Sequence, residues 1–562
     1  MSALPFDQPR VRLPVRAALR LSPLGDIWHK PALSAVAALA LVLLPLYLAG
    51  RLDLVLYAAA GSMCALYGHG LPYAARARAL AWVTLGMLSS TGVALVTAAL
   101  TDSIAIRVAV AALLAGLHKA VCDATRIGPP GNVVLTFIAA SAAFVPQHLA
   151  DVPMHLGLGV LGGAVAWAVG MAPGLIRPDG PERIAVARAL ESAARLLRAY
   201  EGGGPARAVA GRGGVRDELH QARHAAAAAV NAAWQTLLRS GTADRRQELR
   251  RLLVRAESAA ALASVDNQRV PAQELLAEAD RLAGVARELR KGRRLPEPSP
   301  ADPRTAAAER AELAGVAAEE GRPGRRTIRC LLSEVVRRWR VVLMVSGGAA
   351  AAGWASMGLG VGRPYWAVVT AAAVFAANTT LSWSRALQRV VGNLVGVALF
   401  TLLVPVTRLG ALALIVTVLA MQFVTEAAVT RNYWLGSVFV TPMAILMTEF
   451  AGAQPVPVLV ADRWLDTCVG AAAGLLACAL LPDRRAAQRV RDGLGRLELA
   501  VAQEAPPPAE RGVARGRLRT ALVELRETAD TAAGEWWSAA LPHERIAAAE
   551  RAGHHRLAEL TP

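Results

Sequence analysis

The chain has 562 residues, of which 54% are hydrophobic, 19% charged and 5% aromatic. The apolar residues are gathered in blocks, which excludes an ordinary soluble multidomain protein and indicates a membrane protein. The formal net charge of +18 is of a size found in nucleic-acid-binding proteins. Because the basic residues lie between the apolar blocks and in three long polar segments, membrane topology explains them, and we predict no nucleic-acid partner.

Residues 1–30 form a polar N-terminal segment whose five basic side chains precede the first apolar block. A secretory signal peptide has a similar order of charge and apolar residues. This leader is too long, and the first block runs directly into another, so we expect no cleavage.

Twelve apolar blocks approach the roughly 20 residues that a helix needs to cross a bilayer. Each must be helical, because lipid offers no hydrogen-bond partner to an exposed backbone. The first half, residues 31–176, has predicted spans at 31–49, 52–70, 79–99, 104–122, 132–150 and 153–176. The second half, residues 336–482, has predicted spans at 341–360, 365–381, 390–406, 409–428, 434–450 and 462–481. The fold class is therefore an all-α integral membrane protein with about twelve transmembrane helices.

The short loops show a charge asymmetry that orients these spans. With the N-terminus inside, the inner loops carry most of the basic residues, and each outer loop carries at most one. The inner-loop residues are Arg76, Arg78, Lys119, Arg126, Arg385, Arg389 and Arg431. We therefore predict a multi-pass protein of the cell membrane with both termini in the cytoplasm.

Two polar regions have helical periodicity without long apolar runs. Residues 177–335 predict a cytoplasmic helical domain with a proline-rich linker at 292–305. Within it, residues 326–339 place their apolar side chains on one face, which is typical of a helix lying along a membrane surface. Residues 483–562 predict a cytoplasmic helical tail.

A short signature occurs once in each half, at the same place relative to the spans. Thr125-Arg126 is followed by Gly131 and Thr136, and Thr430-Arg431 is followed by Gly436 and Thr441 with identical spacing. Because each half has an even number of spans, the halves are predicted to be parallel repeats, an arrangement that in many transporters places the pathway between them.

Further motifs lie in residues 363–474. They are Arg363-Pro364-Tyr365-Trp366, then Arg385, Arg389, Gly392 and Gly396, then Arg463, Asp466, Gly470 and Gly474. In these motifs the chain resembles the fusaric acid resistance family, also called aromatic acid exporters. The first half matches this pattern less well. The resemblance implies efflux of aromatic carboxylates and related compounds, drawing on the proton motive force.

Several residues are candidates for substrate binding, each with a structural alternative. Arg126 and Arg431 precede predicted helix starts, where a guanidinium and the helix dipole together suit a carboxylate. Thr136 and Thr441 are polar positions within the fifth span of each half. The other candidates have simpler roles as well: Tyr365 and Trp366 as aromatic anchors at the membrane interface, Arg385 and Arg389 as topology-fixing charges. The paired glycines are best explained by close helix packing.

Glu426 and Asp466 are the candidate proton-coupling carboxylates. Glu426 lies near the inner end of its predicted span, where it can pair with Arg431. Asp466 lies about one turn into the last span, where it can pair with Arg463. No carboxylate is predicted at mid-span, and this weakens proton coupling.

The leading hypothesis is a secondary exporter of small organic anions. A passive anion channel and a non-transporting membrane scaffold or sensor, acting through the cytoplasmic domain, are the alternatives. We expect no enzyme, cofactor or metal site, because the histidines near span ends are not grouped with Cys or Asp at metal-ligand spacing. Spans this rich in Ala and Gly also favour a homodimer in the lipid bilayer.

Overall fold

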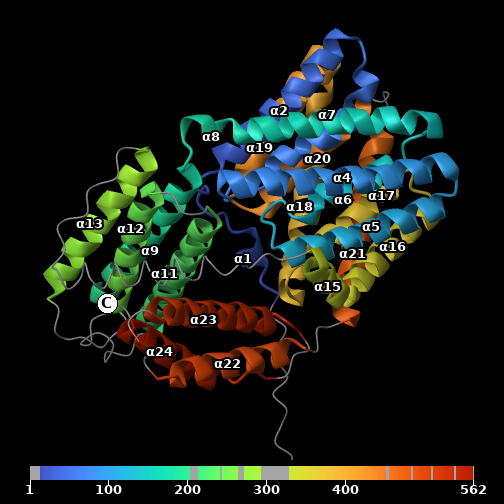
Figure 1. The fold of residues 1–562 in the computed structure, drawn as a ribbon. Coiled ribbons are helices and arrows are strands. Elements are labelled where there is room, and N and C mark those ends of the chain that lie inside the picture. Colours follow the sequence, from blue (N-terminus) through green and yellow to red (C-terminus); the bar gives the residue numbers. More distant parts are fainter. Residues whose placement is uncertain are drawn as a thin grey trace, which may run out of the picture.

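A computed structural model describes residues 13–202, 213–240, 244–263, 271–292, 328–450, 455–481, 485–504, 506–507, 510–536 and 540–560. Over these residues the chain forms helices and no strands, as the sequence predicts. Figure 1 shows one large group of helices formed by α2–α7 and α16–α21, flanked by α9–α13 on one side and α22–α24 below.

Eight described helices are long and apolar enough to cross a membrane by length and composition. They are α2 (His29–Leu48), α4 (Tyr73–Leu100), α5 (Ile104–Thr125), α7 with its flanking turns (Leu149–Ile176), α16 (Trp339–Gly358), α18 (Thr379–Thr407), α19 (Ala411–Val429) and α21 (Val456–Leu480). Each coincides with a predicted span.

The other four predicted spans are shorter apolar helices. They are η1–α3–η2 (Leu52–Leu66), α6 (Asn132–Ala142), α17 (Tyr365–Val374) and α20, apolar over Tyr433–Met447 and helical to Glu449. The first three end before the predicted spans do, and α20 has its predicted length. Breaks in the chain follow the three that end early. Gly68 and Gly70 follow the first of these helices and Pro146 follows the second, while Asn378 accepts a 2.8 Å hydrogen bond from the Leu381 amide and begins α18 instead.

Long and short helices follow the same order in α2–α7 and in α16–α21, which we call the first and second helix sets. In each set the second and fifth helices are the short ones. The first helix of one set packs against the fourth helix of the other: α2 against α19, and α16 against α5. The contact between the sets is therefore reciprocal.

Glycines permit the closest helix approaches within both sets. A Cβ on Gly61 would lie 2.0 Å from the Gly159 carbonyl oxygen, and a Cβ on Gly470 would lie 2.6 Å from that of Ala367. On α18, Gly392 and Gly396 meet the carbonyls of Trp434 and Val438 in the same way, at 2.4 and 2.7 Å. The glycine pairs of the motifs are thus packing positions, as close helix packing with small residues requires.

The polar region between the helix sets forms a bundle with its own apolar core. Its helices are α9 (Gly180–Gly202), α11 (Gly213–Ser240), α12 (Asp244–Leu262) and α13 (Ala272–Lys291). Leu190, Leu253 and Leu282, from three of these helices, are buried in that core. Most of the predicted linker at 292–305 lies outside the described residues.

Three further helices follow α21 and share a second core. They are α22 (Ala486–Ala502), α23 (Arg511–Ala533) and α24 (His543–Glu559). A buried ion pair joins them to the intervening bundle: Arg515 and Arg519 of α23 pair with Glu257 of α12, which also accepts a hydrogen bond from the Trp234 indole. Burial alone raises the pKa of the Glu257 carboxyl, but the two guanidinium groups reverse this and lower its pKa. The carboxylate therefore stays charged inside the protein.

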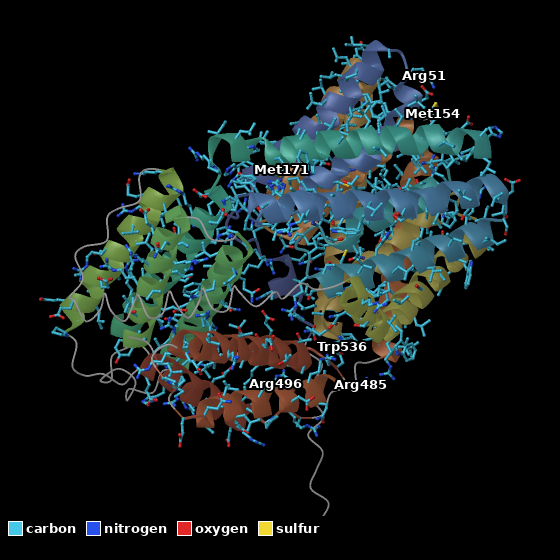
Figure 2. The ribbon with its side chains drawn as sticks, in the orientation of Figure 1. Arg51, Met154, Met171, Arg485, Arg496 and Trp536 are labelled. Carbon is cyan, nitrogen blue, oxygen red and sulfur yellow. The ribbon has the colours of Figure 1, made fainter. Side chains whose placement is uncertain are left out.

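The N-terminal segment and both polar helix groups contact the same end of the apolar helices. The carbonyl of Leu19 accepts a hydrogen bond from the Trp434 indole, and Asp26 pairs with Arg290 of α13 at 2.7 Å. The carbonyl of Gly534 accepts the amide of Thr380 at 3.0 Å. In Figure 2 Trp536 lies at this junction, whereas Arg51 lies at the far end of the first helix set.

A short helix, α15 (Ile328–Arg337), leads into α16. Leu332, Val336 and Trp339, on its predicted apolar face, are all exposed. An apolar stripe of this kind is typical of a helix lying along a membrane surface, as the sequence predicts.

Candidate functional site

The second helix set contains a buried arginine that forms no ion pair with any described carboxylate. Arg463 of α21 is 1% exposed, and its guanidinium carbon lies 3.7 Å from the centre of the Trp366 ring on α17. Within the described part of the chain, its Nε and Nη1 atoms have no hydrogen-bond partner. A stacked guanidinium is held in place by the cation–π interaction while its edge stays available to an anion.

Aromatic rings from both helix sets surround this arginine's stacking partner. Trp366 stacks on Phe137 of α6 at 5.2 Å between ring centres, and Tyr365 lies 5.5 Å from Phe144. Tyr365 and Trp366 are themselves 4.9 Å apart. The aromatic cluster of these four side chains therefore lies at the boundary between the two helix sets.

Asp466 lies one turn after Arg463, fully buried. The Ser356 hydroxyl of α16 donates a hydrogen bond to its Oδ1, and among described residues its Oδ2 has no partner. No hydrogen bond or salt bridge joins Asp466 to Arg463 in the described structure, so the predicted pairing is wrong. Because α21 begins at Val456 and runs for 25 residues, Asp466 lies near its middle, and the expectation of no mid-span carboxylate is also wrong.

Polar side chains extend from this site towards α18 and α20. Asn393 donates to the Arg463 carbonyl at 3.2 Å and accepts from Thr441 at 3.1 Å. Pro442 has no N–H to donate to the Val438 carbonyl, and this carbonyl faces Gly396 instead. Thr441, a predicted site residue, is thus two hydrogen bonds from Arg463.

Tyr365 and Trp366 are buried, so their alternative role as interfacial anchors is wrong. The sequence suggested that role because both follow a loop, but α17 packs inside the protein against α21 and α6. Arg389 is buried too, with Nη1 donating to the Tyr433 hydroxyl at 3.4 Å. Arg385 is exposed and lies 5.9 Å from the centre of the Tyr433 ring.

Arg126 and Arg431, the predicted carboxylate-binding arginines, lie away from this site and are exposed. Arg126 is the C-cap of α5 in the left-handed conformation, and α6 begins at Asn132, beyond it. Arg431 donates to the Ser22 carbonyl at 3.3 Å and so holds the N-terminal segment. Glu426 accepts from Gln422 at 3.0 Å, and no bond joins it to Arg431 among the described residues.

The first helix set has a polar cluster at the corresponding place. His155 of α7 stacks on Tyr57 of α3 at 3.6 Å, and Gln147 is hydrogen-bonded to both, at 2.8 Å to His155 and 3.2 Å to Tyr57. Thr136, the other predicted site residue, is buried and lies 3.3 Å from Nδ1 of His118. These contacts hold neutral groups together.

Sequence reasoning did not single out His155, Asn393 or Ser356. One signal was present for His155: it lies four residues before Gly159, as Asp466 lies four residues before Gly470. Asn393 and Ser356 had no such signal, because their roles depend on which helices pack together.

Together, the apolar helices and the buried polar site define an integral membrane protein of the helical class. Residues 349–477 match the family model described as "Fusaric acid resistance protein-like". This match covers all of the motifs from Arg363 to Gly474, so the resemblance to the fusaric acid resistance family is confirmed for this domain, which includes Trp366, Arg463 and Asp466.

A curated relative extends the similarity over most of the chain. It is the "Uncharacterized membrane protein YvaC" of Bacillus subtilis (strain 168), 25% identical over 517 residues, which are 87% of this chain and 78% of that protein. No solved structure matches the chain.

Proposed function

We propose that the protein is a secondary exporter of aromatic carboxylates or related small organic anions. The observation that carries this proposal is the buried guanidinium of Arg463, which is stacked on Trp366 and has two nitrogen atoms without a partner among the described residues. A guanidinium pairs with a carboxylate through two parallel hydrogen bonds, and an aromatic substrate suits a site beside aromatic rings. The fusaric acid resistance-like domain supports the same substrate class.

In this proposal the two helix sets are parallel repeats and the substrate passes between them. The shared order of long and short helices and the reciprocal contacts of α2 with α19 and α16 with α5 support it. Since Arg463 is almost completely covered, substrate reaches it only when the helices around it move apart, including α6 and α17 at the boundary between the sets. Alternating access by movement of one repeat against the other provides such an opening.

Asp466 is the proposed proton-coupling residue. It is a buried acid at the middle of a membrane helix, one turn from the proposed substrate arginine, and one of its oxygens is unpartnered among the described residues. Ionisable groups in such positions mark proton and ion pathways. Proton uptake and anion release would then occur at adjacent side chains.

The basic loops support a cytoplasmic location for the end where the N-terminal segment and the polar helix groups meet the apolar helices. The predicted homodimer, the lack of enzymatic activity and the lack of a nucleic-acid partner stay predictions of the sequence.

The test measures accumulation of a panel of aromatic carboxylates in cells lacking the protein, complemented with wild type or with Arg463→Gln. We expect wild type to lower accumulation and an uncoupler to remove its effect. A charge-assisted hydrogen bond contributes about 1.5–3 kcal/mol, so Arg463→Gln should weaken substrate affinity at least about tenfold. Arg463→Lys keeps the charge but not the planar fork, and should lie between the two.

Arg408→Gln is the matched control, because Arg408 is an exposed arginine at the C-terminal end of α18 in the same helix set, and this variant should export normally. Accumulation that the protein leaves unchanged for every compound contradicts export. Net efflux that persists with an uncoupler and follows the anion gradient indicates a passive channel instead.

A further inference from the structure

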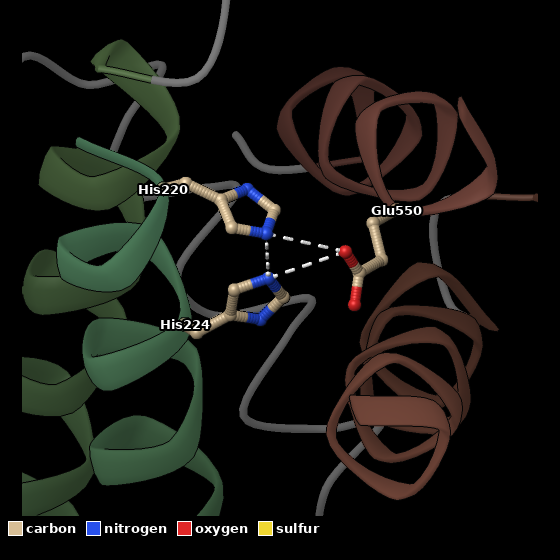
Figure 3. A group of neighbouring side chains, drawn as sticks. All are labelled: His220, His224 and Glu550. Carbon is tan, nitrogen blue, oxygen red and sulfur yellow. Dashed lines mark hydrogen bonds and ion pairs between the residues drawn. The ribbon is translucent and has the colours of Figure 1, made fainter. Parts of the chain in front are cut away.

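Two histidines and a glutamate from distant parts of the chain meet outside the membrane helices. His220 and His224 lie one turn apart on α11, so both side chains leave the same face of that helix. Glu550 lies on α24, more than 300 residues later, and is directed at both imidazoles (Figure 3). The junction between the intervening bundle and the C-terminal helices therefore contains a group of three potential metal ligands.

The distances between the three ligand atoms match those around a tetrahedral metal ion. The two histidine Nε2 atoms are 3.1 Å apart, and they lie 3.3 and 3.5 Å from Oε2 of Glu550. Metal–ligand bonds of about 2.0–2.1 Å at tetrahedral angles place neighbouring ligand atoms about 3.3 Å apart. The three atoms thus form one face of a tetrahedron of the right size.

Protons satisfy this arrangement only in part. If both Nε2 atoms carry a hydrogen, both N–H groups point at the same Oε2 atom with their nitrogens only 3.1 Å apart. If one is unprotonated, it turns a lone pair towards the carboxylate, although on His220 that lone pair can accept from Arg526. A cation at the centre accepts a lone pair from all three atoms at once.

Burial and charge favour metal binding by this carboxylate. Glu550 is 1% exposed, and its Oε1 has no partner among the described residues. Arg526 supplies a counter-charge beside the carboxylate, and Oε1 can bond a water on the fourth position.

One neighbouring cation opposes a metal ion, and it can move away. Arg526 of α23 lies 3.8 Å from Glu550 Oε2 and 3.5 Å from the His220 Nε2 atom. Its Nε also pairs with Asp530 at 3.0 Å, and its side chain is 39% exposed. Because the arginine is already paired at the surface, a metal ion can displace it without leaving it buried and unpaired.

We propose that His220, His224 and Glu550 form a binding site for a divalent transition metal, with Zn²⁺ as the best-fitting ion, that clamps α24 onto α11. Two imidazoles and a carboxylate are ligands that Zn²⁺ accepts with water in the fourth position. The sequence alone missed this site because two ligands at helical spacing do not identify the third, which lies on another element.

The test uses the full-length protein in detergent, purified with a tag that contains no histidine. After loading with Zn²⁺ and dialysis, wild type should retain one metal per chain by elemental analysis. His220→Ala/His224→Ala should lose this metal, and Glu550→Gln should bind at least about tenfold more weakly, as loss of a ligand removes one bond to the ion. Co²⁺ in place of Zn²⁺ should give wild type the strong visible absorption of tetrahedral cobalt.

His555→Ala is the matched control, because His555 is an exposed histidine of the same helix that pairs with Glu559. It should bind like wild type. Retention of well under one metal per chain by wild type overturns the proposal, and so does equal binding by the double variant. If Glu550→Gln does not yield folded protein, the double variant and the Co²⁺ spectrum decide the question, since His220 and His224 are only partly buried.

Discussion

The two helix sets place different chemistry at corresponding positions. In the first set, His155, Tyr57 and Gln147 are hydrogen-bonded or stacked on one another and carry no formal charge when the imidazole is neutral. In the second set, Arg463 and Asp466 are buried one turn apart without pairing. A closed neutral cluster stabilises the structure, whereas buried charges without partners are costly and are kept where function needs them. This difference favours the second set as the working site.

The largest expected effect comes from removing the carboxylic acid of Asp466, which occupies the position that His155 has in the first helix set. Asp466→Asn should abolish uncoupler-sensitive export, because an amide keeps the hydrogen bond with Ser356 but cannot carry a proton. His155→Gln, the matched change in the first set, should leave coupled export in place. Transport driven by an imposed pH gradient in proteoliposomes measures both.

If Asp466→Asn and His155→Gln both abolish coupling, the two sets share the proton pathway and the comparison fails. If Asp466→Asn exports normally, the coupling site lies elsewhere.

An intermediate effect is expected from the packing glycines. A Cβ on Gly470 would lie 2.6 Å from a backbone oxygen of Ala367, which cannot move without shifting α17. A Cβ on Gly159 would meet the end of the flexible Leu88 side chain at the same distance. Overpacking costs about 1–3 kcal/mol, so Gly470→Ala should lower the thermal midpoint in detergent clearly more than Gly159→Ala. Equal thermal midpoints for the two variants would contradict this expectation and show that both helix contacts accommodate a Cβ equally well.

The smallest effect is expected from Arg126 and Arg431, the arginines of the repeated signature, for which the sequence predicted carboxylate binding. Arg126 and Arg431 are both exposed, and no hydrogen bond joins either of them to Arg463 among the described residues. Exposed charges contribute at most about 1 kcal/mol, so neutralising either one should change the apparent substrate affinity by about fivefold or less. A much larger loss of affinity would indicate that Arg126 and Arg431 bind substrate after all.

The fold could largely be predicted from the sequence because length and hydropathy decide it. Eight predicted spans appear as long apolar helices, and the helical character of both polar regions was also correct. Three of the four shorter helices were overestimated because hydropathy does not show where a backbone leaves the helix, whereas α20 has its predicted length. The start of α21 was misplaced in the other direction: the helix begins at Val456, six residues before the predicted start, and this puts Asp466 near mid-helix.

The site was predicted less well than the fold. Arg463 and Asp466 were recognised from their motif, but as a pair. Their separation depends on Trp366, which stacks on the arginine, and on Ser356, which bonds the acid. Both partners come from other helices, so no local spacing indicated them. Metal ligands from α11 and α24 escaped notice for the same reason.

The buried Glu257 carboxylate has a consequence for how the chain is made. Its helix is synthesised before the second helix set, yet its counter-charges, Arg515 and Arg519, emerge more than 250 residues later. Until α23 leaves the ribosome, the intervening bundle holds an acid that must stay hydrated or take up a proton. Final closure of this bundle therefore waits for the last transmembrane helix to be inserted. A chain truncated before α23 would expose an incomplete surface to proteolysis.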